Sequence, residues 1–262
     1  MSLNQKAWTT LFERYQILEA IEDKGFYEIS AKAIKEEREP RLMAKFDHFK
    51  NLPEVFRQHQ LSILPLSRSS YIIGDFQVYK DLQYEKDAAL KEVYLPASIR
   101  SLDPKQLYSE SAALHCAYAT GMIDQLLSER AVPTVSGRMS SSQFQFRIQT
   151  RRGAEREIAI KNAQVEIDAG FESESAFMIV EAKKESVKDF LIRQLYYPYR
   201  LWRDKLTKPI KSMFFTHSND IFSFFEFDFS DPTRYNSLVL RKQSHFIVEH
   251  EKNNNGGYLP AA

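Results

Sequence analysis

The stretch Ile167-Asp168 … Phe177-Met178-Ile179-Val180-Glu181-Ala182-Lys183 decides the fold that we expect for this chain. It places an acid at the end of one apolar run and a Glu-x-Lys triplet at the end of the next. Side chains alternate between the two faces of a strand, so Glu181 and Lys183 point the same way and Ala182 points into the opposite layer. If the two strands pair, Asp168 lies beside Glu181, and Lys183 stands next to both.

This pattern has two interpretations: a catalytic metal site, or a solvent-exposed ion pair without a catalytic role. Two converging carboxylates form the hard-oxygen site that Mg²⁺ prefers, and an adjacent lysine can hold a phosphate or orient a water, as metal-assisted phosphodiester hydrolysis requires. In a chain with 27% charged residues, however, most Glu-x-Lys triplets are solvated pairs worth roughly 0–1 kcal/mol. The buried run before Glu181 favours the first interpretation. Two carboxylates about 4 Å apart repel by roughly 4 kcal/mol at an effective dielectric near 20, which a cation or Lys183 would offset.

The motif resembles that of the PD-(D/E)XK nuclease superfamily, with Asp168, Glu181 and Lys183 in the signature positions. Longer strings are similar to one group of type II restriction endonucleases: residues 39–47, 61–66, 164–172, 179–183 and 189–202. Ile167 replaces the proline of the motif's name, at a position that varies among such nucleases. Pro198 stands four residues after Gln194, where exonuclease-like relatives carry a tyrosine, which argues against the recombination-nuclease branch.

The resemblance implies a type II site-specific deoxyribonuclease that cleaves double-stranded DNA with Mg²⁺ as cofactor. Asp168 and Glu181 would bind the metal, and Lys183 would orient or activate the attacking water. Gln194 would brace the lysine or contact the phosphate. Glu110, in the first turn of an expected helix, resembles a further metal ligand of this superfamily, although the helix dipole alone also favours an acid there. Glu166 shares the face of Asp168 and is a rival ligand.

The resemblance also implies partners. Cutting both strands requires two active sites, so we expect a homodimer matching a palindrome, with a monomer that cuts sequentially as the alternative. A restriction-modification system would add a cognate DNA methyltransferase. Two other functions stay open: a DNA-binding regulator with a non-catalytic nuclease-like domain, and a repair nuclease that reads DNA structure instead of sequence.

Base recognition is expected from basic and amide side chains outside the signature. The candidate DNA-binding residues are Lys35, Arg38, Arg41, Lys45, Gln164 and Arg193. A net charge of +1 neither indicates nor excludes DNA binding, because acidic residues elsewhere can offset the charge of a basic face. Further basic residues are expected to cluster around the site: Arg151, Arg152, Lys184, Lys188, Arg200, Arg203, Lys205, Lys208 and Lys211.

Composition indicates a cytoplasmic chain that does not bind membranes. The 262 residues are 43% hydrophobic, enough for a sizeable core, and no apolar run approaches the length of a membrane span. The first residues lack the apolar stretch of a signal peptide, and the single cysteine, Cys116, cannot form an internal disulfide. The polar tail at residues 253–257 is expected to fray.

The expected fold class is α/β. A restriction-endonuclease-like core over residues 96–262 would have a central mixed sheet flanked by helices. Residues 1–95 would form a helical, winged-helix-like module with a β-hairpin that assists DNA recognition. Periodicity predicts helices at residues 5–24, 31–37, 53–58, 107–130 and 189–201. It predicts strands at residues 26–29, 61–66, 71–79, 144–148, 157–160, 165–167, 177–180, 211–216 and 221–227, with a connector at residues 84–105.

Overall fold

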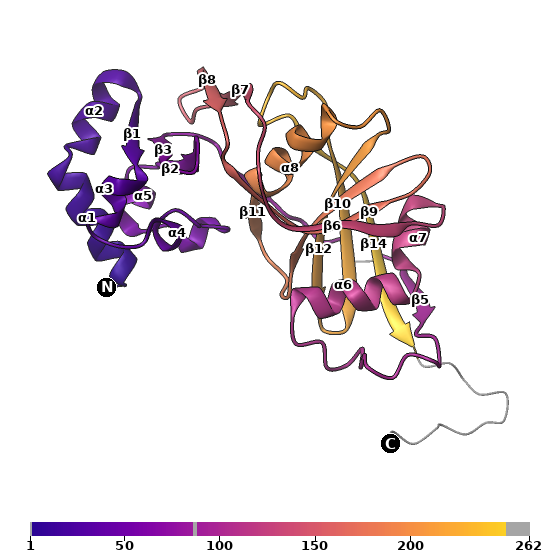
Figure 1. Ribbon diagram of the computed structural model, residues 1–262. Coiled ribbons are helices and arrows are strands. Elements are labelled where there is room, and N and C mark those ends of the chain that lie inside the picture. Colours follow the sequence, from indigo (N-terminus) through magenta and orange to yellow (C-terminus); the bar gives the residue numbers. More distant parts are fainter. Residues whose placement is uncertain (1, 86–87, 250–262) are drawn as a thin grey trace.

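A computed structural model describes residues 2–85 and 88–249 (Figure 1). It is a mixed α/β structure in which a large central sheet is flanked by helices, and a smaller N-terminal part lies beside it. The expected α/β class with a central mixed sheet is therefore confirmed. Within the described residues, no helix has the length and apolar character that crossing a membrane requires. The tail at residues 253–257 lies outside the described residues.

The N-terminal part has its own small sheet and its own core. Its three strands run in the order β1-β3-β2 and are antiparallel. Trp8, Phe12 and Phe56 pack edge to face in a core drawn from Ala7 to Ile73. The elements are α1 (Leu3–Arg14), α2 (Ile17–Lys24), β1 (Phe26–Ser30), α3 (Ala31–Lys35), α4 (Pro40–Met43), the 3₁₀ turn η1 (Phe49–Asn51), α5 (Glu54–Gln58), β2 (Ser62–Pro65) and β3 (Ser70–Gly74).

Local signals in this part are mostly confirmed. Ser30 caps α3 by accepting a hydrogen bond from the Ala33 amide at 3.1 Å, and Pro65 ends an edge strand. The single helix expected at residues 5–24 is wrong, because Gln16 adopts a left-handed φ of 47° and separates α1 from α2. The strand expected at residues 71–79 is also split. β3 ends at Gly74, and Tyr79 begins a separate strand.

The central sheet is mixed and, in the described residues, has seven strands in the order β5-β14-β13-β12-β10-β9-β6. The β10–β12 and β14–β5 pairs are parallel, and the other neighbours are antiparallel. The strands are β5 (Leu90–Tyr94), β6 (Val132–Ser140), β9 (Gln164–Glu172), β10 (Phe177–Lys183), β12 (Ile210–Ser218), β13 (Ile221–Phe229) and β14 (Leu238–Glu249).

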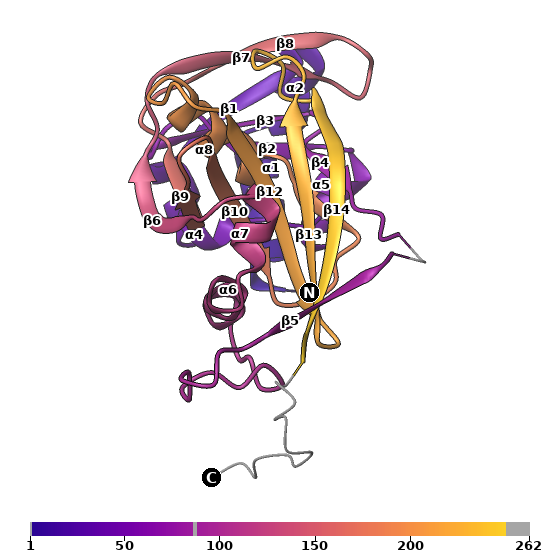
Figure 2. The ribbon, with the colours of Figure 1, turned by 90° about the vertical axis from the view of Figure 1, so that its right-hand side faces the viewer.

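Helices cover both faces of this sheet (Figure 2). α6 (Glu110–Ala119) and α7 (Met122–Leu127) pack on one face, where Ala182 and Phe215 are buried with them. α8 (Arg193–Arg203) packs on the other face, where Ile179 and Phe214 are buried. The inner strands, such as β10 and β12, therefore send alternate side chains into two separate cores, as period-two geometry requires.

Two short strand pairs lie outside the main sheet. β7 (Phe144–Gln149) and β8 (Glu155–Ile160) form an antiparallel hairpin, which confirms the strands expected there. β4 (Tyr79–Asp81) pairs with β11 (Asp189–Leu191). The helix expected from residue 189 therefore begins only at Arg193, because the three residues before it are extended in this pairing.

Two other expectations are wrong for identifiable reasons. The helix expected at residues 107–130 is broken by Gly121, whose φ of 75° is left-handed and ends the regular hydrogen-bonding pattern between α6 and α7. The connector expected at residues 84–105 contains β5, which pairs with β14 at one edge of the central sheet. β5 is mostly exposed and lacks the apolar alternation of a half-buried strand, so periodicity did not indicate it.

Candidate functional site

The strand pair β9–β10 brings the signature acids together. The two strands are antiparallel, and Val180 pairs with Ala169. The adjacent residues Glu181 and Asp168 therefore lie opposite each other. The Ala182 amide donates a hydrogen bond to Asp168 Oδ2 at 2.8 Å. Ala182 itself is buried in the opposite layer. The expected orientation of these side chains is therefore confirmed.

Glu181 is held from two sides. Lys183 Nζ lies 2.5 Å from Glu181 Oε1, and Gln194 Nε2, from the first turn of α8, donates to the same oxygen. Glu181 and Gln194 are buried, at 6% and 9% exposure. Gln194 therefore contacts the acid, and any bracing of Lys183 by Gln194 would have to act through Glu181.

These side chains line one pocket of about 330 Å³. Among the described residues that line it, five are acidic and three are basic, an excess of negative charge that favours a bound cation. The lining residues are Lys45, Asp47, Glu110, Val165, Glu166, Asp168, Glu181, Lys183, Arg193, Gln194, Tyr197 and Pro198. All of the predicted catalytic and metal-binding residues are among them.

Burial sets the protonation of the acids. It raises the pKa of Glu181 to about 8, which Lys183 only partly counteracts, and burial also raises the pKa values of Asp168 and Glu110. Burial lowers the pKa of Lys183, but attraction to Glu181 and Asp47 outweighs it, and the net pKa is well above that of a free lysine. Lys183 thus stays charged, and the metal-free pocket disfavours a fully ionised set of carboxylates.

Two further acids, Glu110 and Glu166, lie at the pocket but differ in their partners. Glu110 begins α6, and burial raises its pKa more than the nearby Lys183 lowers it. Glu166 lies 3.5 Å from Lys45 Nζ and 3.1 Å from Arg138 Nε. Because two cations already neutralise Glu166, Glu110 is the better placed of the two to bind a metal.

The N-terminal part contributes Asp47, which sequence reasoning did not identify as a site residue. Asp47 Oδ2 lies 3.9 Å from Lys183 Nζ, and Asp47 Oδ1 is buried without a hydrogen-bond partner in the described part of the chain. The Leu191 amide donates to the Asp47 carbonyl at 3.0 Å, and His48 Nδ1 contacts the Asp189 carbonyl at 2.6 Å. These bonds fasten the segment to β11. The only sequence signal was the resemblance of residues 39–47.

The predicted DNA-binding residues divide into two groups. Lys45 and Arg193 line the pocket. Lys35, Arg41 and Gln164 are exposed outside the pocket lining, and Arg38 donates to Asn4 Oδ1 at 2.6 Å within the N-terminal part.

The expected clustering of other basic residues around the site is wrong for several of them. Arg200 is buried and donates to the Gln145 carbonyl at 2.9 Å. Lys208 pairs with Glu172 at 2.8 Å, and Arg151 and Arg152 line a different cavity. Nearness in sequence did not predict nearness in space. Arg200 is on α8, where successive side chains point in different directions, and Lys208, Arg151 and Arg152 lie outside that helix.

The pocket fits a hard cation in its chemistry. Hydrogen bonds within the protein use one oxygen of Asp168 and one of Glu181, which leaves the other oxygen of each carboxylate for a ligand. Within the described residues, no group of three or more His, Cys, Asp or Glu side chains is already drawn together as a metal cluster. Two carboxylates completed by water suit Mg²⁺, which usually keeps several waters when protein-bound.

Comparisons with known proteins identify two families. No curated protein and no solved structure matches the chain. Residues 5–73 match a model described as a domain of unknown function, DUF6996. Residues 74–247 match a second model, described as a domain of unknown function, DUF6997. The change from one model to the other falls in β3, at the end of the N-terminal core. Because the second match covers more than half of the residues, the chain belongs to the DUF6997 family.

Proposed function

We propose that this chain is a type II restriction endonuclease that hydrolyses phosphodiester bonds in double-stranded DNA at a specific sequence, with Mg²⁺ as cofactor. The observation that carries the proposal is the convergence of Asp168, Glu181, Lys183 and Gln194 in one pocket. The local topology also supports a restriction-endonuclease-like core. The β9–β10 hairpin is followed by α8 and then by β12, parallel to β10, while α6 covers the other face.

The chain's own residues have distinct roles in this proposal. Asp168 and Glu181, with Glu110, would hold the Mg²⁺. When bound, the cation would offset charge on the phosphate and lower the pKa of an attacking water. Lys183, kept charged by Glu181 and Asp47, would donate a hydrogen bond to a phosphate oxygen or to that water. Gln194 fixes the position of Glu181, because it donates to the same oxygen as Lys183.

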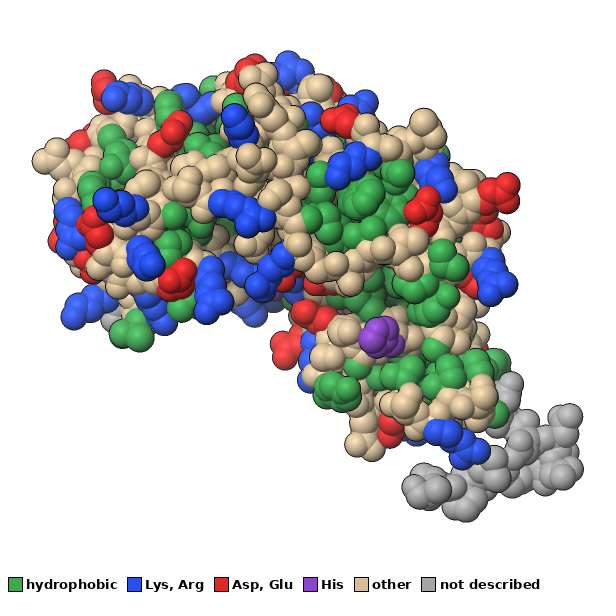
Figure 3. Space-filling view, in the orientation of Figure 1, with side chains coloured by type: hydrophobic (Ala, Val, Ile, Leu, Met, Phe, Trp, Pro, Cys, Tyr) green, Lys and Arg blue, Asp and Glu red, His purple; other side chains and the backbone are tan. Residues whose placement is uncertain are grey.

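The shape of the molecule supports binding of an extended anionic ligand. Figure 3 shows Lys and Arg side chains along the lower edge of the N-terminal part, next to the hollow that separates it from the C-terminal part. Lys45 and Arg193 extend this positive charge into the pocket. We propose that Lys35, Arg38, Arg41 and Gln164 contribute to DNA recognition by a winged-helix-like module. A twofold dimer would supply the second active site, and a cognate methyltransferase would protect the host DNA.

Plasmid cleavage tests the proposal. The purified chain is incubated with plasmid DNA of known sequence in Mg²⁺, in Ca²⁺ and in EDTA. We expect discrete fragments with Mg²⁺ alone, and Asp168→Ala and Lys183→Ala should each abolish them while retaining DNA binding. Arg241→Ala, which removes an exposed arginine paired with Asp228, is the matched control and should cut normally.

The other outcomes distinguish the alternatives. DNA binding without cleavage under every condition would support a regulator. Cleavage only at nicks, flaps or mismatches would support a structure-specific repair nuclease. If Lys183→Ala cut at the wild-type rate, the proposed role of the pocket would be wrong. Sequencing the fragment ends gives the recognition sequence and the stagger, and sedimentation of the DNA complex distinguishes a dimer from a monomer that cuts sequentially.

A further inference from the structure

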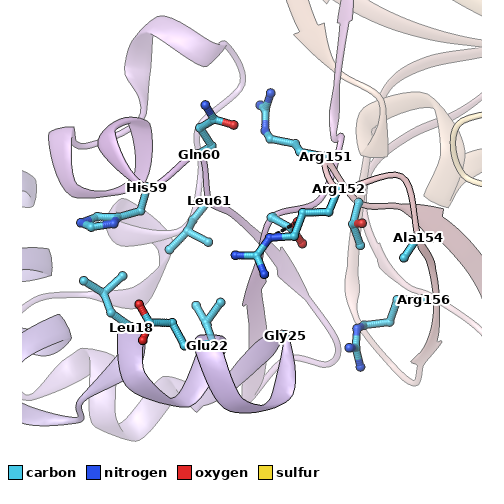
Figure 4. Close-up of a pocket in the computed structure, with 13 residues that line it drawn as sticks. Leu18, Glu22, Gly25, His59, Gln60, Leu61, Arg151, Arg152, Ala154 and Arg156 are labelled. Carbon is cyan, nitrogen blue, oxygen red and sulfur yellow. Dashed lines mark ion pairs between the residues drawn. The ribbon is translucent and has the colours of Figure 1, made fainter.

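A second cavity lies between the N-terminal part and the β7–β8 hairpin (Figure 4). Its volume is about 330 Å³, within the range of small-molecule sites and too small for a DNA duplex. It shares no lining residue with the candidate active site. The lining residues are Leu18, Ile21, Glu22, Gly25, His59, Gln60, Leu61, Asp75, Thr150, Arg151, Arg152, Ala154 and Arg156.

Three arginines of the β7–β8 hairpin form one wall, Arg151 and Arg152 from the turn and Arg156 from β8, and they have different roles. Arg156 Nη2 donates to the Lys24 carbonyl at 2.9 Å, and its guanidinium lies 4.5 Å from the ring centre of Phe26. A Cβ at Gly25 would approach Arg156 Nη2 to 2.8 Å, and the φ of Gly25 is +78°. Arg156 is therefore a packing residue that ties the hairpin to the N-terminal part, and glycine is required at position 25 for its close approach.

Arg151 and Arg152 do not pack the hairpin against the N-terminal part as Arg156 does. Arg151 is exposed, lies 6.0 Å from the ring centre of Phe49, and makes no ion pair within the described residues. Arg152 extends into the cavity in Figure 4, and its Nε lies 3.8 Å from Asp75 Oδ2. Its side chain is 77% exposed, so this long pair contributes little to stability. Two guanidinium groups are thus free to bind an anion bidentately.

Two residues that line the cavity carry buried side-chain oxygens that have no hydrogen-bond partner among the described residues. Thr150 is buried at 7% exposure, and its Oγ1 makes no hydrogen bond. Asp75 Oδ2 is also buried without a hydrogen bond. Buried polar atoms are nearly always paired, and an unpaired one is unfavourable. These features are typical of a surface shaped for a ligand.

The opposite wall, from the N-terminal part, is mixed. Leu18 and Leu61 lie there with Glu22, His59 and Gln60 in Figure 4, Ile21 also lines the cavity, and Ala154 lies on the hairpin side. The cavity thus joins an anion-binding edge, a hydrogen-bond acceptor and a face that can cover a flat ring. A nucleotide has a matching set of groups: a phosphate, a base edge with hydrogen-bond donors, and an aromatic plane.

We propose that this cavity binds a single nucleotide, with its phosphate on Arg151 and Arg152 and its base against the leucines of the opposite wall with the donor edge toward Asp75. Guanine should bind best, because its adjacent N1–H and N2–H groups can both donate to Asp75 Oδ1, whereas thymine offers one donor; Asp75 Oδ2 is buried toward Arg152. The nucleotide is either free or part of an unpaired DNA strand. The inference does not rest on the proposed cleavage activity, because the two cavities are separate.

Calorimetric titration in EDTA tests the inference on the full chain. The probes are dGMP, dTMP, inorganic phosphate and a short single-stranded oligonucleotide. We expect dGMP to bind more tightly than dTMP and phosphate. The double variant R151A/R152A, at two exposed positions, should weaken dGMP binding at least tenfold. Asp75→Asn should remove the preference for dGMP over dTMP. Arg241→Ala and Lys183→Ala should bind dGMP like the wild type.

Several outcomes would overturn the inference. They are the absence of dGMP binding up to about 10 mM, equal affinity for phosphate and dGMP, unchanged binding by R151A/R152A, and loss of binding in Lys183→Ala. If the inference holds, competition identifies the source of the nucleotide. Displacement of dGMP by the oligonucleotide indicates a nucleotide within a DNA strand, and its failure to compete indicates a free nucleotide.

Discussion

Replacing Glu181 by glutamine should change how the stability of the metal-free protein depends on pH. Glu181 is buried, and burial raises its pKa from 4.5 to about 8. The folded protein therefore retains a proton on Glu181 at pH values where the unfolded chain has lost it. This contribution to stability is fully present below pH 4.5 and is lost as the pH rises through about 8. Glutamine has nearly the same shape, can still accept from Lys183, and does not titrate.

The size of the effect follows from the pKa shift. Each pH unit between the two pKa values costs up to about 1.4 kcal/mol of unfolding free energy, which sets an upper limit of about 5 kcal/mol over the window. Attraction from Lys183 and water entering the pocket reduce this figure. We expect the wild type to lose about 2–4 kcal/mol relative to Glu181→Gln between pH 5 and pH 8.5.

Urea unfolding in EDTA, followed by circular dichroism at several pH values, measures this difference. Glu226→Gln is the matched control, because Glu226 pairs with Lys211 at 3.4 Å and does not line the candidate site. This control should follow the wild-type dependence on pH. Parallel stability curves for Glu181→Gln and the wild type would refute the argument that desolvation controls this carboxylate.

Three further predictions concern other parts of the molecule. Phe56→Ala should destabilise the N-terminal part by about 3–5 kcal/mol, because it leaves a cavity beside Trp8, and tryptophan fluorescence in urea would detect an unfolding transition at lower urea. Burial lowers the pKa of His245, so the protein should lose stability as the pH falls below 6.5, and His245→Gln should reduce that loss in thermal unfolding between pH 7 and pH 5. Burial raises the pKa of the Cys116 thiol to about 11, so iodoacetamide at pH 8 should label it only after unfolding, and rapid labelling of the folded chain would contradict this.

Local sequence rules predicted what depends on neighbours in the chain. The common direction of Glu181 and Lys183 follows from the two-residue period of a strand, and Asp168 came beside them through a short hairpin. The cap at Ser30 likewise follows from a side chain that bonds the amide three residues later, whereas the cap at Ser109 was not predicted. Helix interruptions at Gln16 and Gly121 were not predicted, because apolar periodicity continues across them.

The sequence by itself determined the αβ class and which acids share a face with Lys183, because both follow from strand periodicity within a short segment. Only the tertiary structure decided that Asp47 approaches Lys183, that Gln194 contacts Glu181, and that Arg151 and Arg152 face a different cavity. These contacts depend on the packing of α8, β11 and the N-terminal part. Packing between segments distant in the chain leaves no periodic signal in the sequence, because each contact is selected by shape and charge at a single position.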